Sequence, residues 1–457
     1  MGNARIAIVG GGVTGLVAAR ELLRAGWQVS IYERWPDVSG QASAFDVGDG
    51  VLLDRYYHHL FQSDREMTAL HEELLPGELE WHASTVGMFA DGHIHPFTTP
   101  FDLLTYTPLP LPDRMRLGVA ILRLMRRTDW ERMDDEPAFE WLRANCGERA
   151  VDKVWTPLML GKFGDDAETV PLAWLWSKLA LRRQKLSGES ASKELLGYPK
   201  RSFHAICWAL ADDVRRRGGG IHVDREVVRV DRDGDGFVLR CAAPRAYRMP
   251  AGSALADNGR EARADAVVFT TPTNVTRRLA AWPTSFAGRL DAWSYRAAAV
   301  LVLELRRQFS QTYWTNIVDR DMPFLGVIEH TNLVPAERYP ARYLYVSNYV
   351  AQDDPLMRST TDELLAHVLP GLARMHRGFS ERDVVRAWSF REEAAQPVPR
   401  VGNRHRVLPF ASPVPGLFIA NTTQIYPEDR GTNYSVRLGR DVARAIMEER
   451  QALPIAA

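Results

Sequence analysis

The amino-terminal segment alternates short apolar runs with a helical pattern. Residues 6–9 are all apolar and are followed by glycines, which predicts a short buried strand. Residues 29–32 are predicted as a second strand, which ends at Glu33. Between them, apolar residues recur at helical spacing until Gly26, a residue typical of a helix C-terminus; these positions are Leu16, Ala19, Leu22 and Leu23. The segment from about Ile6 to Glu33 therefore predicts a strand–helix–strand unit.

Three glycines lie between the first strand and the helix in the spacing G-x-G-x-x-G. The first permits a tight turn, the second lets the backbone approach a pyrophosphate, and the third lets the helix pack closely on the strand. The N–H groups at the helix start can bind phosphate, and Glu33 can bind ribose hydroxyls while repelling a 2′-phosphate. The unit predicts bound FAD or NAD, which the motif alone does not distinguish. The expected contacts are Gly10, Gly12, Val13, Thr14, Gly15, Glu33 and Arg34.

Further patterns lie along the chain. Residues 221–230 predict one strand with Val227 at its centre, followed by a hairpin around residues 231–236. Residues 297–303 form an uncharged apolar run that stops at Glu304, which predicts a buried strand. Residues 113–127 predict an amphipathic helix carrying several arginines, which is expected to pack one face on the protein, with contact to anionic lipid as the alternative.

Composition narrows the class of protein. Of the 457 residues, 46% are hydrophobic and 25% charged, as in ordinary globular proteins. Lysine plus arginine equals aspartate plus glutamate, 57 each, which gives no support for a nucleic-acid partner. The three cysteines are scattered and predict neither a metal site nor a disulfide framework. The start of the chain lacks a secretory pattern and no run approaches the ~20 apolar residues of a membrane span. We therefore expect a cytoplasmic protein, of undetermined oligomeric state, without metal or transmembrane segment.

Two later segments resemble the flavin amine oxidase and protoporphyrinogen oxidase superfamily. Residues 262–272 are similar to that family's acidic and apolar strand ending in proline, and residues 415–422 with 434–443 are similar to its closing strand, loop and helix. The resemblance implies an α/β fold: a Rossmann-type (GR2-like) FAD-binding domain and a discontinuous second α+β domain for a small-molecule substrate. The implied FAD-binding domain comprises residues 1–70, 190–285 and 395–457, and the substrate domain comprises residues 71–189 and 286–394.

The resemblance also implies cofactor contacts. A valine at position 227 would contact adenine through its backbone, and the closing helix would point its N-terminus at the flavin. No cysteine or histidine begins that helix, so we expect non-covalent FAD. The family's paired glycines are replaced by Gly40-Gln41-Ala42 and by residues 200–202, and Arg201 or Arg430 could supply the missing positive charge. The implied contacts are Gly40, Gln41, Ala42, Val227, Thr271, Asn421, Asn433, Tyr434, Ser435 and Val436.

Residues 52–63 are dense in aromatic and histidine side chains. They resemble the Asp-x-Gly-x-His-type segment of the oxidases and, over residues 59–63, the His-Ile-Phe-His-Thr segment of UDP-galactopyranose mutases, with Gln62 replacing the second histidine. A histidine beside a flavin can orient the ring or transfer protons; the alternative is a structural histidine bonded to backbone carbonyls. The candidate catalytic residues are His58, His59, Arg430 and Tyr434.

Two further charged residues, Lys162 and Arg430, each have two possible interpretations. Lys162 lies between glycines and is expected to be a surface lysine in a loop, with binding of an anionic substrate group as the alternative. Arg430 could contact substrate or flavin, or form an ion pair with Glu428 or Asp429.

The resemblance implies an FAD-dependent oxidoreductase of the oxidase, dehydrogenase or desaturase type, which takes a hydride from an organic substrate to flavin N5. Residues 59–61 support a second hypothesis, a redox-neutral nucleotide-sugar mutase. A non-catalytic FAD-binding subunit is the third. The substrate and the electron acceptor stay open at this point.

Overall fold

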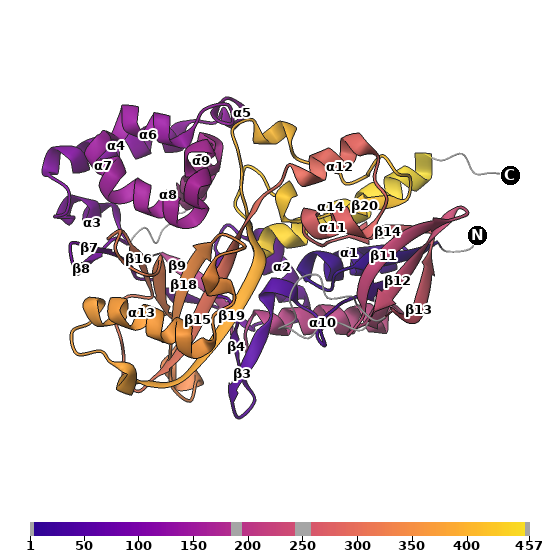
Figure 1. The fold of residues 1–457 in the computed structure, drawn as a ribbon, viewed down its shortest axis with the longest axis horizontal. Helices are drawn as coiled ribbons and strands as arrows, with labels where there is room; N and C mark the ends of the chain where they lie inside the picture. The colour runs from indigo at the N-terminus through magenta and orange to yellow at the C-terminus, as the bar shows by residue number, and fades with distance from the viewer. Residues whose placement is uncertain (1–3, 184–193, 243–256, 453–457) are drawn as a thin grey trace.

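Five parallel strands form the sheet that contains the amino-terminal unit (Figure 1). The computed structural model describes residues 4–183, 194–242 and 257–452. The strand order is β10 (Gly220–His222), β2 (Gln28–Tyr32), β1 (Arg5–Val9), β14 (Ala266–Phe269) and β20 (Leu417–Ile419). Helix α1 (Val13–Arg24) joins β1 to β2, so the predicted strand–helix–strand unit is confirmed.

The two faces of this sheet are covered differently, because side chains alternate along each strand. Ile6 and Ile8 pack in one core with α1, α10 (Phe203–Arg216) and α14 (Thr432–Ala452). Ala7 and Val9 point the other way, into a core with a three-stranded antiparallel sheet of β11 (Glu226–Asp233), β12 (Gly236–Ala242) and β13 (Asp257–Ala264). That second core also contains residues of α11 (Thr273–Leu279) and α12 (Thr284–Asp291).

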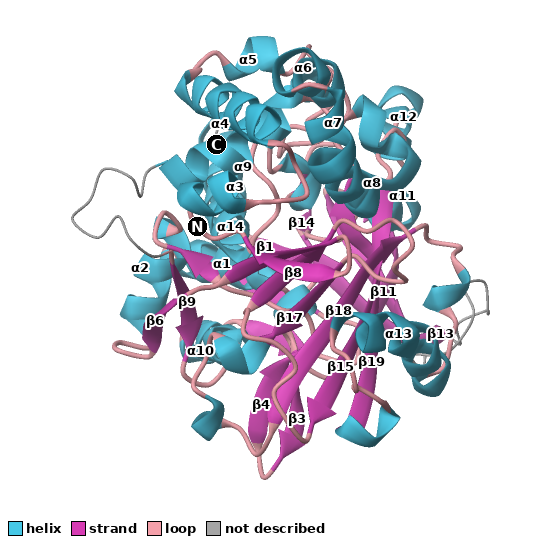
Figure 2. Cartoon of the chain, turned by 90° about the vertical axis from the view of Figure 1, so that its left-hand side faces the viewer, coloured by secondary structure: helices cyan, strands magenta, loops and turns pink. Residues whose placement is uncertain are grey.

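A seven-stranded sheet is the second large element (Figure 2). Its order is β19 (Val384–Pro397), β15 (Tyr295–Leu305), β18 (Arg342–Val350), β17 (Gly326–Glu329), β16 (Trp314–Ile317), β7 (Val86–Ala90) and β8 (His93–Pro96). On β15, Leu301 and Leu303 pack with helix α13 (Thr361–Met375), whereas Val300 and Val302 pack in the core that contains α1. The inner face of this sheet therefore faces the parallel-sheet half of the molecule.

The remaining helices form a separate layer with its own core, at the upper left of Figure 1. They are α3 (Pro100–Thr105), α4 (Leu111–Arg126), α5 (Trp130–Met133), α6 (Ala138–Cys146), α7 (Glu148–Ala150), α8 (Thr156–Phe163) and α9 (Leu172–Arg183). Helix α2 (Arg65–Leu74) lies against α14 and α10. Two small sheets complete the fold, β3 (Ala44–Gly48) with β4 (Val51–Asp54), and β9 (Leu195–Pro199) between β5 (Leu60–Phe61) and β6 (Leu79–Ala83).

Most of the predicted elements are present. The helix predicted at 113–127 is α4, the strand predicted at 297–303 is β15, and β11 and β12 form the predicted hairpin. The prediction of one strand over residues 221–230 is wrong: a turn at Asp224, whose φ is 50°, separates β10 from β11, and Val227 is near the start of β11. A left-handed residue cannot continue an extended strand, so the two parts join different sheets.

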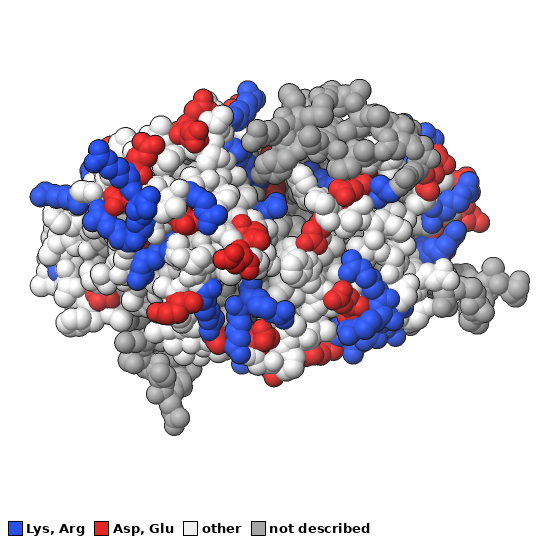
Figure 3. All heavy atoms as spheres, turned by 90° about the horizontal axis from the view of Figure 1, so that it is seen from below, with Lys and Arg blue, Asp and Glu red and all other residues white. Residues whose placement is uncertain are grey.

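Surface charge is mixed, as the equal numbers of acidic and basic residues suggest. Acidic and basic side chains are interspersed over the face seen in Figure 3. Within the described part of the chain, no helix is both long enough and apolar enough to cross a bilayer. The three cysteines are free and buried, as expected.

Two serines adopt a backbone conformation that favours glycine. Ser39, which precedes Gly40, has φ 125°, and Ser202, the last residue of the segment 200–202, has φ 116°. Both are buried. The Ser39 hydroxyl hydrogen-bonds to His204 Nδ1 at 2.8 Å, whereas the Ser202 hydroxyl has no hydrogen-bond partner among the described residues. Each serine therefore adopts a backbone conformation that only glycine adopts without strain, which lowers the stability of the fold by about 1–3 kcal/mol per site.

Replacing Ser202 by glycine should stabilise the protein. Ser202→Gly removes both the strained Cβ and the unpaired hydroxyl, and the free energy of unfolding should rise by about 1 kcal/mol after the entropy cost of glycine. Urea unfolding measures this. Ser202→Ala is the matched control, because it removes the hydroxyl and keeps the strain. If the alanine variant were as stable as the glycine variant, the backbone at position 202 would not be strained by a Cβ.

Asp54 joins four elements at the end of β4. Its carboxylate accepts hydrogen bonds from Tyr198 Oη at 2.7 Å and from Phe203 N at 3.1 Å, and its carbonyl accepts one from Tyr345 Oη at 2.6 Å. Burial raises the pKa of Asp54 from 3.8 to about 7, although both bonds to the carboxylate act to lower it. The folded protein therefore holds a proton that the unfolded chain releases near pH 4, and stability should fall as the pH rises from 4 to 7.

The variant Asp54→Asn should lack this pH dependence. Between pH 5 and pH 7 the wild-type protein should lose about 2–3 kcal/mol of unfolding free energy relative to the variant, since each pKa unit is worth about 1.4 kcal/mol. Guanidinium unfolding at both pH values gives the comparison. The control is Asp235→Asn, at an exposed turn. Parallel pH profiles of wild type and Asp54→Asn would refute the raised pKa.

Candidate functional site

The glycine turn after β1 brings two stretches of backbone into contact. Gly10 has φ 113°, and a Cβ at Gly15 would lie only 2.1 Å from the Gly10 carbonyl oxygen. Gly12 is the N-cap of α1, and no side chain caps this helix. A Cβ at Gly40 would lie 3.3 Å from the Gly12 Cα, so the short turn of residues 40–42 packs directly on the glycine turn. The N–H groups at the start of α1, around Val13 and Thr14, are therefore left without a side-chain cap and are the kind of donors that bind phosphate.

Glu33 lies beside this turn, as the sequence predicts. Its carboxylate accepts hydrogen bonds from Gly11 N at 2.6 Å and from Trp35 N at 3.0 Å. Glu33 is only 6% exposed, and burial raises its pKa although both backbone donors act to lower it. A carboxylate has about four acceptor positions, which leaves two for other donors such as ribose hydroxyls. Gly11 was not among the predicted contacts, because its role is to position Glu33 through its N–H group.

A second helix begins beside the first. Thr14 Oγ1 donates to the Ser435 carbonyl at 3.2 Å, and a Cβ at Gly439 would lie 2.7 Å from the Thr14 carbonyl oxygen. Helices α1 and α14 therefore cross at backbone contact, with their N-termini side by side. Gly439 was not predicted as a site residue, although a glycine inside a helical pattern signals close packing. Asn433 accepts from Met67 N at 3.1 Å.

The other implied cofactor residues line the same edge of the parallel sheet or support it. Asn421 Nδ2 donates to the Thr271 carbonyl at 2.9 Å, which joins the ends of β20 and β14. Gln41 Nε2 donates to the Ala394 carbonyl at 3.2 Å, towards β19. The Arg34 guanidinium lies 4.9 Å from the centre of the Trp35 ring. Other members are buried, and these are Ala42, Val227, Tyr434 and Val436.

A network of charged and polar side chains precedes α14. Asp429 Oδ2 lies 2.8 Å from Lys162 Nζ and 2.6 Å from Lys178 Nζ, and Oδ1 accepts from Trp174 Nε1 at 3.3 Å and from Gln396 Nε2 at 3.1 Å. Burial acts to raise the pKa of Asp429, but the neighbouring cations outweigh it and hold the pKa well below its usual value. Asp429 is therefore a carboxylate that links α8, α9 and β19 to the loop before α14.

Arg430 points from the same loop toward β18. Its Nη2 donates to Tyr349 Oη at 2.6 Å and its Nε to Gln396 Oε1 at 3.1 Å. Burial acts to raise the pKa of Tyr349, but Arg430 and Lys162 outweigh it and lower the pKa below its usual value. The alternative of an ion pair between Arg430 and Glu428 is not what the structure shows, because Glu428 pairs with Arg437 at 3.0 Å.

Lys162 differs from its prediction. The residue lies on helix α8 rather than in a loop, and its side chain is only 19% exposed. The expectation of a surface lysine is therefore wrong: its ammonium group pairs with Asp429 and lies 5.5 Å from the centre of the Tyr349 ring. Neither Asp429 nor Tyr349 is near Lys162 in the sequence, so no local pattern could indicate these contacts. Arg201 is exposed and lies 3.4 Å from Glu78.

The two histidines have different surroundings. His59 Nδ1 shares a hydrogen bond with Tyr313 Oη at 3.0 Å, and the ring meets Phe61 edge to face at 5.1 Å. His58 Nδ1 is shielded from solvent and has no hydrogen-bond partner among the described residues. Burial, together with the positive charge of Arg430, lowers the pKa of His58 to about 4. His58 is therefore neutral at pH 7 and belongs to the surroundings of Arg430.

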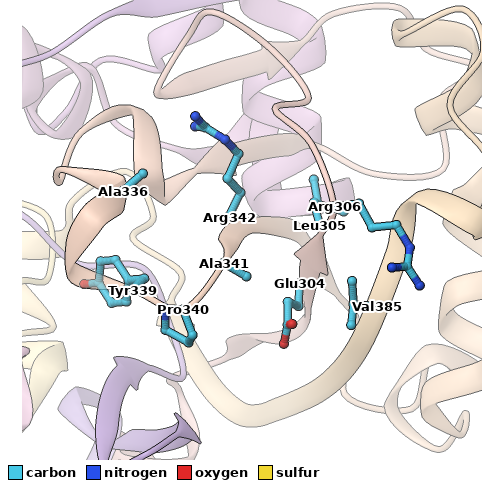
Figure 4. A pocket seen from close by; sticks show the side chains of 9 residues that line it. All are labelled: Glu304, Leu305, Arg306, Ala336, Tyr339, Pro340, Ala341, Arg342 and Val385. Carbon is cyan, nitrogen blue, oxygen red and sulfur yellow. The ribbon is translucent and has the colours of Figure 1, made fainter.

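A hollow of about 480 Å³ lies elsewhere, at the end of β15 and β18 (Figure 4). It is shallow, and its polar side chains are engaged within the protein: Glu304 pairs with Arg386 at 2.6 Å, and Tyr339 Oη bonds His330 Nε2 at 2.7 Å. We therefore do not assign the site to this hollow. In the described ranges, no group of His, Cys, Asp and Glu side chains could hold a metal ion.

The fold and the geometry of the glycine turn define a protein that binds a dinucleotide at the carboxyl edge of a parallel sheet. The residues fit FAD, since Glu33 has two free acceptor positions, Gly10 and Gly15 permit the close turn into α1, and Gly12 has no side chain at the helix start. Residues 13–447 match the family model described as flavin containing amine oxidoreductase. The chain belongs to this family, whose cofactor is FAD.

Individual proteins are similar over different lengths. The "Probable zeta-carotene desaturase" of Synechococcus elongatus is 27% identical over 255 residues, which cover 50% of this chain and 51% of that protein. The carotenoid phi-ring synthase of Streptomyces griseus is 26% identical over 301 residues, 60% of this chain and 54% of that protein. The chain thus spans about half the length of these relatives.

Two solved structures share the fold. One is described as "Putative protoporphyrinogen oxidase from Exiguobacterium sp. 255-15"; its TM-score is 0.76 at 17% identity, and the match covers 98% of this chain and 100% of that chain. The other is a reduced UDP-galactopyranose mutase, with a TM-score of 0.73 at 16% identity over 98% and 96%. These structures confirm the fold predicted from the sequence, and the family match over residues 13–447 confirms the predicted superfamily.

Removing the charge of Glu33 should weaken FAD binding. Glu33→Gln keeps the size of the side chain but loses charge-assisted hydrogen bonds, so the Kd for FAD should rise about tenfold or more. Titration of the apoprotein with FAD, followed by quenching of flavin fluorescence, measures this. Glu140→Gln on the exposed face of α6 is the matched control. An unchanged Kd in Glu33→Gln would remove Glu33 from the cofactor site.

Proposed function

We propose that this protein is an FAD-dependent dehydrogenase of the desaturase type, acting on an apolar organic substrate. Bound flavin supplies the hydride acceptor at N5, and the substrate gains a carbon–carbon double bond by losing that hydride and a proton. An external electron acceptor must then reoxidise the flavin. Two of the curated relatives are named as carotene and phytoene desaturases, which supports this reaction type over only half of the chain.

The charged side chains around the loop before α14 indicate which class of substrate can enter. Lys162, Lys178 and Arg430 contribute three positive charges, against one carboxylate at Asp429. A protonated amine entering this region would be repelled, because charges interact strongly where water is scarce. We therefore favour a neutral substrate over an ammonium ion, although the family is named for amine oxidation.

Aromatic rings support an apolar substrate. Tyr57, His59 and Phe61 are partly exposed, and so is Trp314, which meets the Tyr57 ring edge to face at 4.9 Å. Such rings bury large apolar area at a low entropy cost. His59, whose ring is held by its hydrogen bond to Tyr313, would orient the substrate. Tyr434 and Arg430 would lie beside the flavin.

Tyr349 is the proposed proton acceptor. Arg430 and Lys162 lower its pKa and so favour the phenolate form that accepts a proton, whereas the pKa of His58 is only about 4. A positioned base typically contributes a factor of about 10²–10⁴ to the rate. The proton leaves the carbon next to the one that gives up the hydride, which completes the double bond.

The mutase is the second candidate. It is supported by residues 59–61 and by the fold of the mutase structure. A nucleotide sugar needs cations for its diphosphate, but in the part of the chain described here Lys162, Lys178 and Arg430 already have acceptors within the protein. Gln62 also replaces the second histidine of that pattern. We therefore favour desaturation.

Anaerobic mixing of FAD-loaded protein with substrates tests the proposal. A polyene hydrocarbon such as phytoene, in detergent, should bleach the oxidised flavin absorbance, whereas putrescine should not. Bleaching by the amine alone would contradict the proposal. Turnover of UDP-galactopyranose only after dithionite reduction would establish the mutase instead.

Removing the Tyr349 hydroxyl should slow the reduction of FAD by substrate. In Tyr349→Phe the rate should fall about 10²-fold or more while FAD content stays unchanged, because only the proton acceptor is lost. Stopped-flow absorbance measures the rate. Tyr343→Phe, near the other end of β18, removes a buried phenol away from Arg430 and serves as the control. Equal rates in both variants would exclude Tyr349 as the base.

A further inference from the structure

Exposed apolar side chains are concentrated on α3 and α4. The described residues include ten exposed large apolar side chains, and six of them lie on these two helices. Phe101 is 69% exposed, and the others are 41–55% exposed: Leu104, Leu111, Met115, Val119 and Leu122. Single exposed apolar residues need no explanation, but a contiguous group of this kind marks an interaction surface.

Helix α4 has two apolar faces. At 100° per residue, Leu111, Met115, Val119 and Leu122 fall within one third of the helix circumference. The opposite side carries Leu117, Ala120 and Leu124, which are buried in the core of the helical layer. The predicted packing of one face is therefore confirmed, and the second apolar face is additional to what the fold requires. In Figure 1 both helices lie at the outer left end of the molecule.

Arginines border the exposed face. Arg116 and Arg123 line a hollow of about 400 Å³ between α4 and α6, together with Met115 and Val119. Arg116 donates to the carbonyls of Ala144 and Asn145 at 2.8 and 2.9 Å. No acidic side chain among the described residues pairs with Arg123 or with Arg126, one turn further along the helix. Asp113, the acidic residue of α4, pairs with Arg149 at 3.1 Å.

We propose that α3 and α4 dock this protein on the surface of an anionic lipid bilayer. The stripe of Leu111, Met115, Val119 and Leu122, which we call the α4 apolar stripe, enters the boundary between headgroups and acyl chains. Arg123 and Arg126 meet lipid phosphates, and the hollow beside Arg123 admits one headgroup. An apolar face bordered by arginines is the pattern of a helix that lies in the membrane interface.

Charge decides between this partner and a second copy of the chain. A two-fold contact through the α4 apolar stripe would bring the same arginines of both copies together. Their mutual repulsion disfavours such a dimer, whereas a bilayer with anionic headgroups attracts them by about fivefold in affinity for each arginine.

The position of the stripe also suits the proposed function, although the docking does not depend on it. Leu117 and Leu124 share a core with Trp174 of α9, and Trp174 contacts Asp429. A bilayer on α4 would thus lie one helix away from the charged network. An apolar substrate would then have only a short path from the bilayer to the region of the charged network.

Sedimentation with vesicles tests the docking. FAD-loaded protein should bind vesicles of phosphatidylglycerol and phosphatidylcholine at least about tenfold more tightly than vesicles of phosphatidylcholine alone. Raising sodium chloride from about 0.1 M to about 1 M shortens the Debye length from about 10 Å to about 3 Å and should remove most of this preference. Absence of binding to the anionic vesicles, or equal binding to both kinds, overturns the proposal.

Two pairs of variants separate the apolar and charged contributions. Met115→Ser with Leu122→Ser should bind anionic vesicles at least about tenfold more weakly, and Arg123→Gln with Arg126→Gln about 30-fold more weakly. The controls are Val385→Ser with Val401→Ser, exposed elsewhere, and Arg215→Gln with Arg216→Gln on α10. Retained flavin absorbance shows that each variant is folded.

Other occupants give distinct results. A dimer seen by light scattering, abolished by the Met115 and Leu122 changes, in a protein that does not bind vesicles would assign the stripe to a second copy. Binding of inorganic phosphate at Arg123 without vesicle binding would make the hollow a simple anion site. Either result overturns the docking, and neither affects the reduction of flavin by substrate, which tests the proposed function separately.

Discussion

The close approach of backbone to backbone at helix α1 is the constraint on which the site depends. The first turn of α1 contacts the Gly10 carbonyl at Gly15, and the neighbouring Thr14 carbonyl contacts α14 at Gly439. Neither approach leaves room for a Cβ. Together they hold two helix N-termini side by side above the parallel sheet, where their positive ends can stabilise a diphosphate and the negative charge of a reduced flavin.

The second constraint is electrostatic. Asp429 lies next to two lysines and close to Arg430, and these residues come from α8, α9 and the loop before α14. Removing one partner of such a group typically costs about 3–5 kcal/mol, because the remaining charges lose their compensation. The network therefore holds the helical layer against the cofactor half of the molecule. It also leaves an excess of positive charge close to Tyr349, which lowers the pKa of this phenol.

The sequence predicted those parts of the fold that are encoded locally. The first strand, the glycine turn, α1 and Glu33 form a continuous pattern, and β15 and α4 have the apolar spacing of their elements. The turn at Asp224 was missed because aspartate adopts left-handed φ only in some contexts. Ser39 lies beside, and Ser202 within, the two segments that depart from the family's glycine pairs, yet both have a φ that favours glycine, so the change of residue type did not indicate a different turn.

The charged part of the site was less predictable. Arg430 was identified as a candidate from its loop, but its partners Tyr349 and Gln396 lie on other strands. Lys162 was expected at the surface because local composition cannot indicate an aspartate that is 267 positions away. Pairing over such distances is set by the tertiary fold, and a single sequence carries no signal for it.

A crystal structure of the protein with bound FAD would show the cofactor site itself. We expect ribose hydroxyls bonded to Glu33, the diphosphate at the N-termini of α1 and α14, and the flavin ring facing Tyr349 and Arg430. Electron density for the ring on the opposite side of the parallel sheet, or for an adenosine group away from Glu33, would contradict this arrangement.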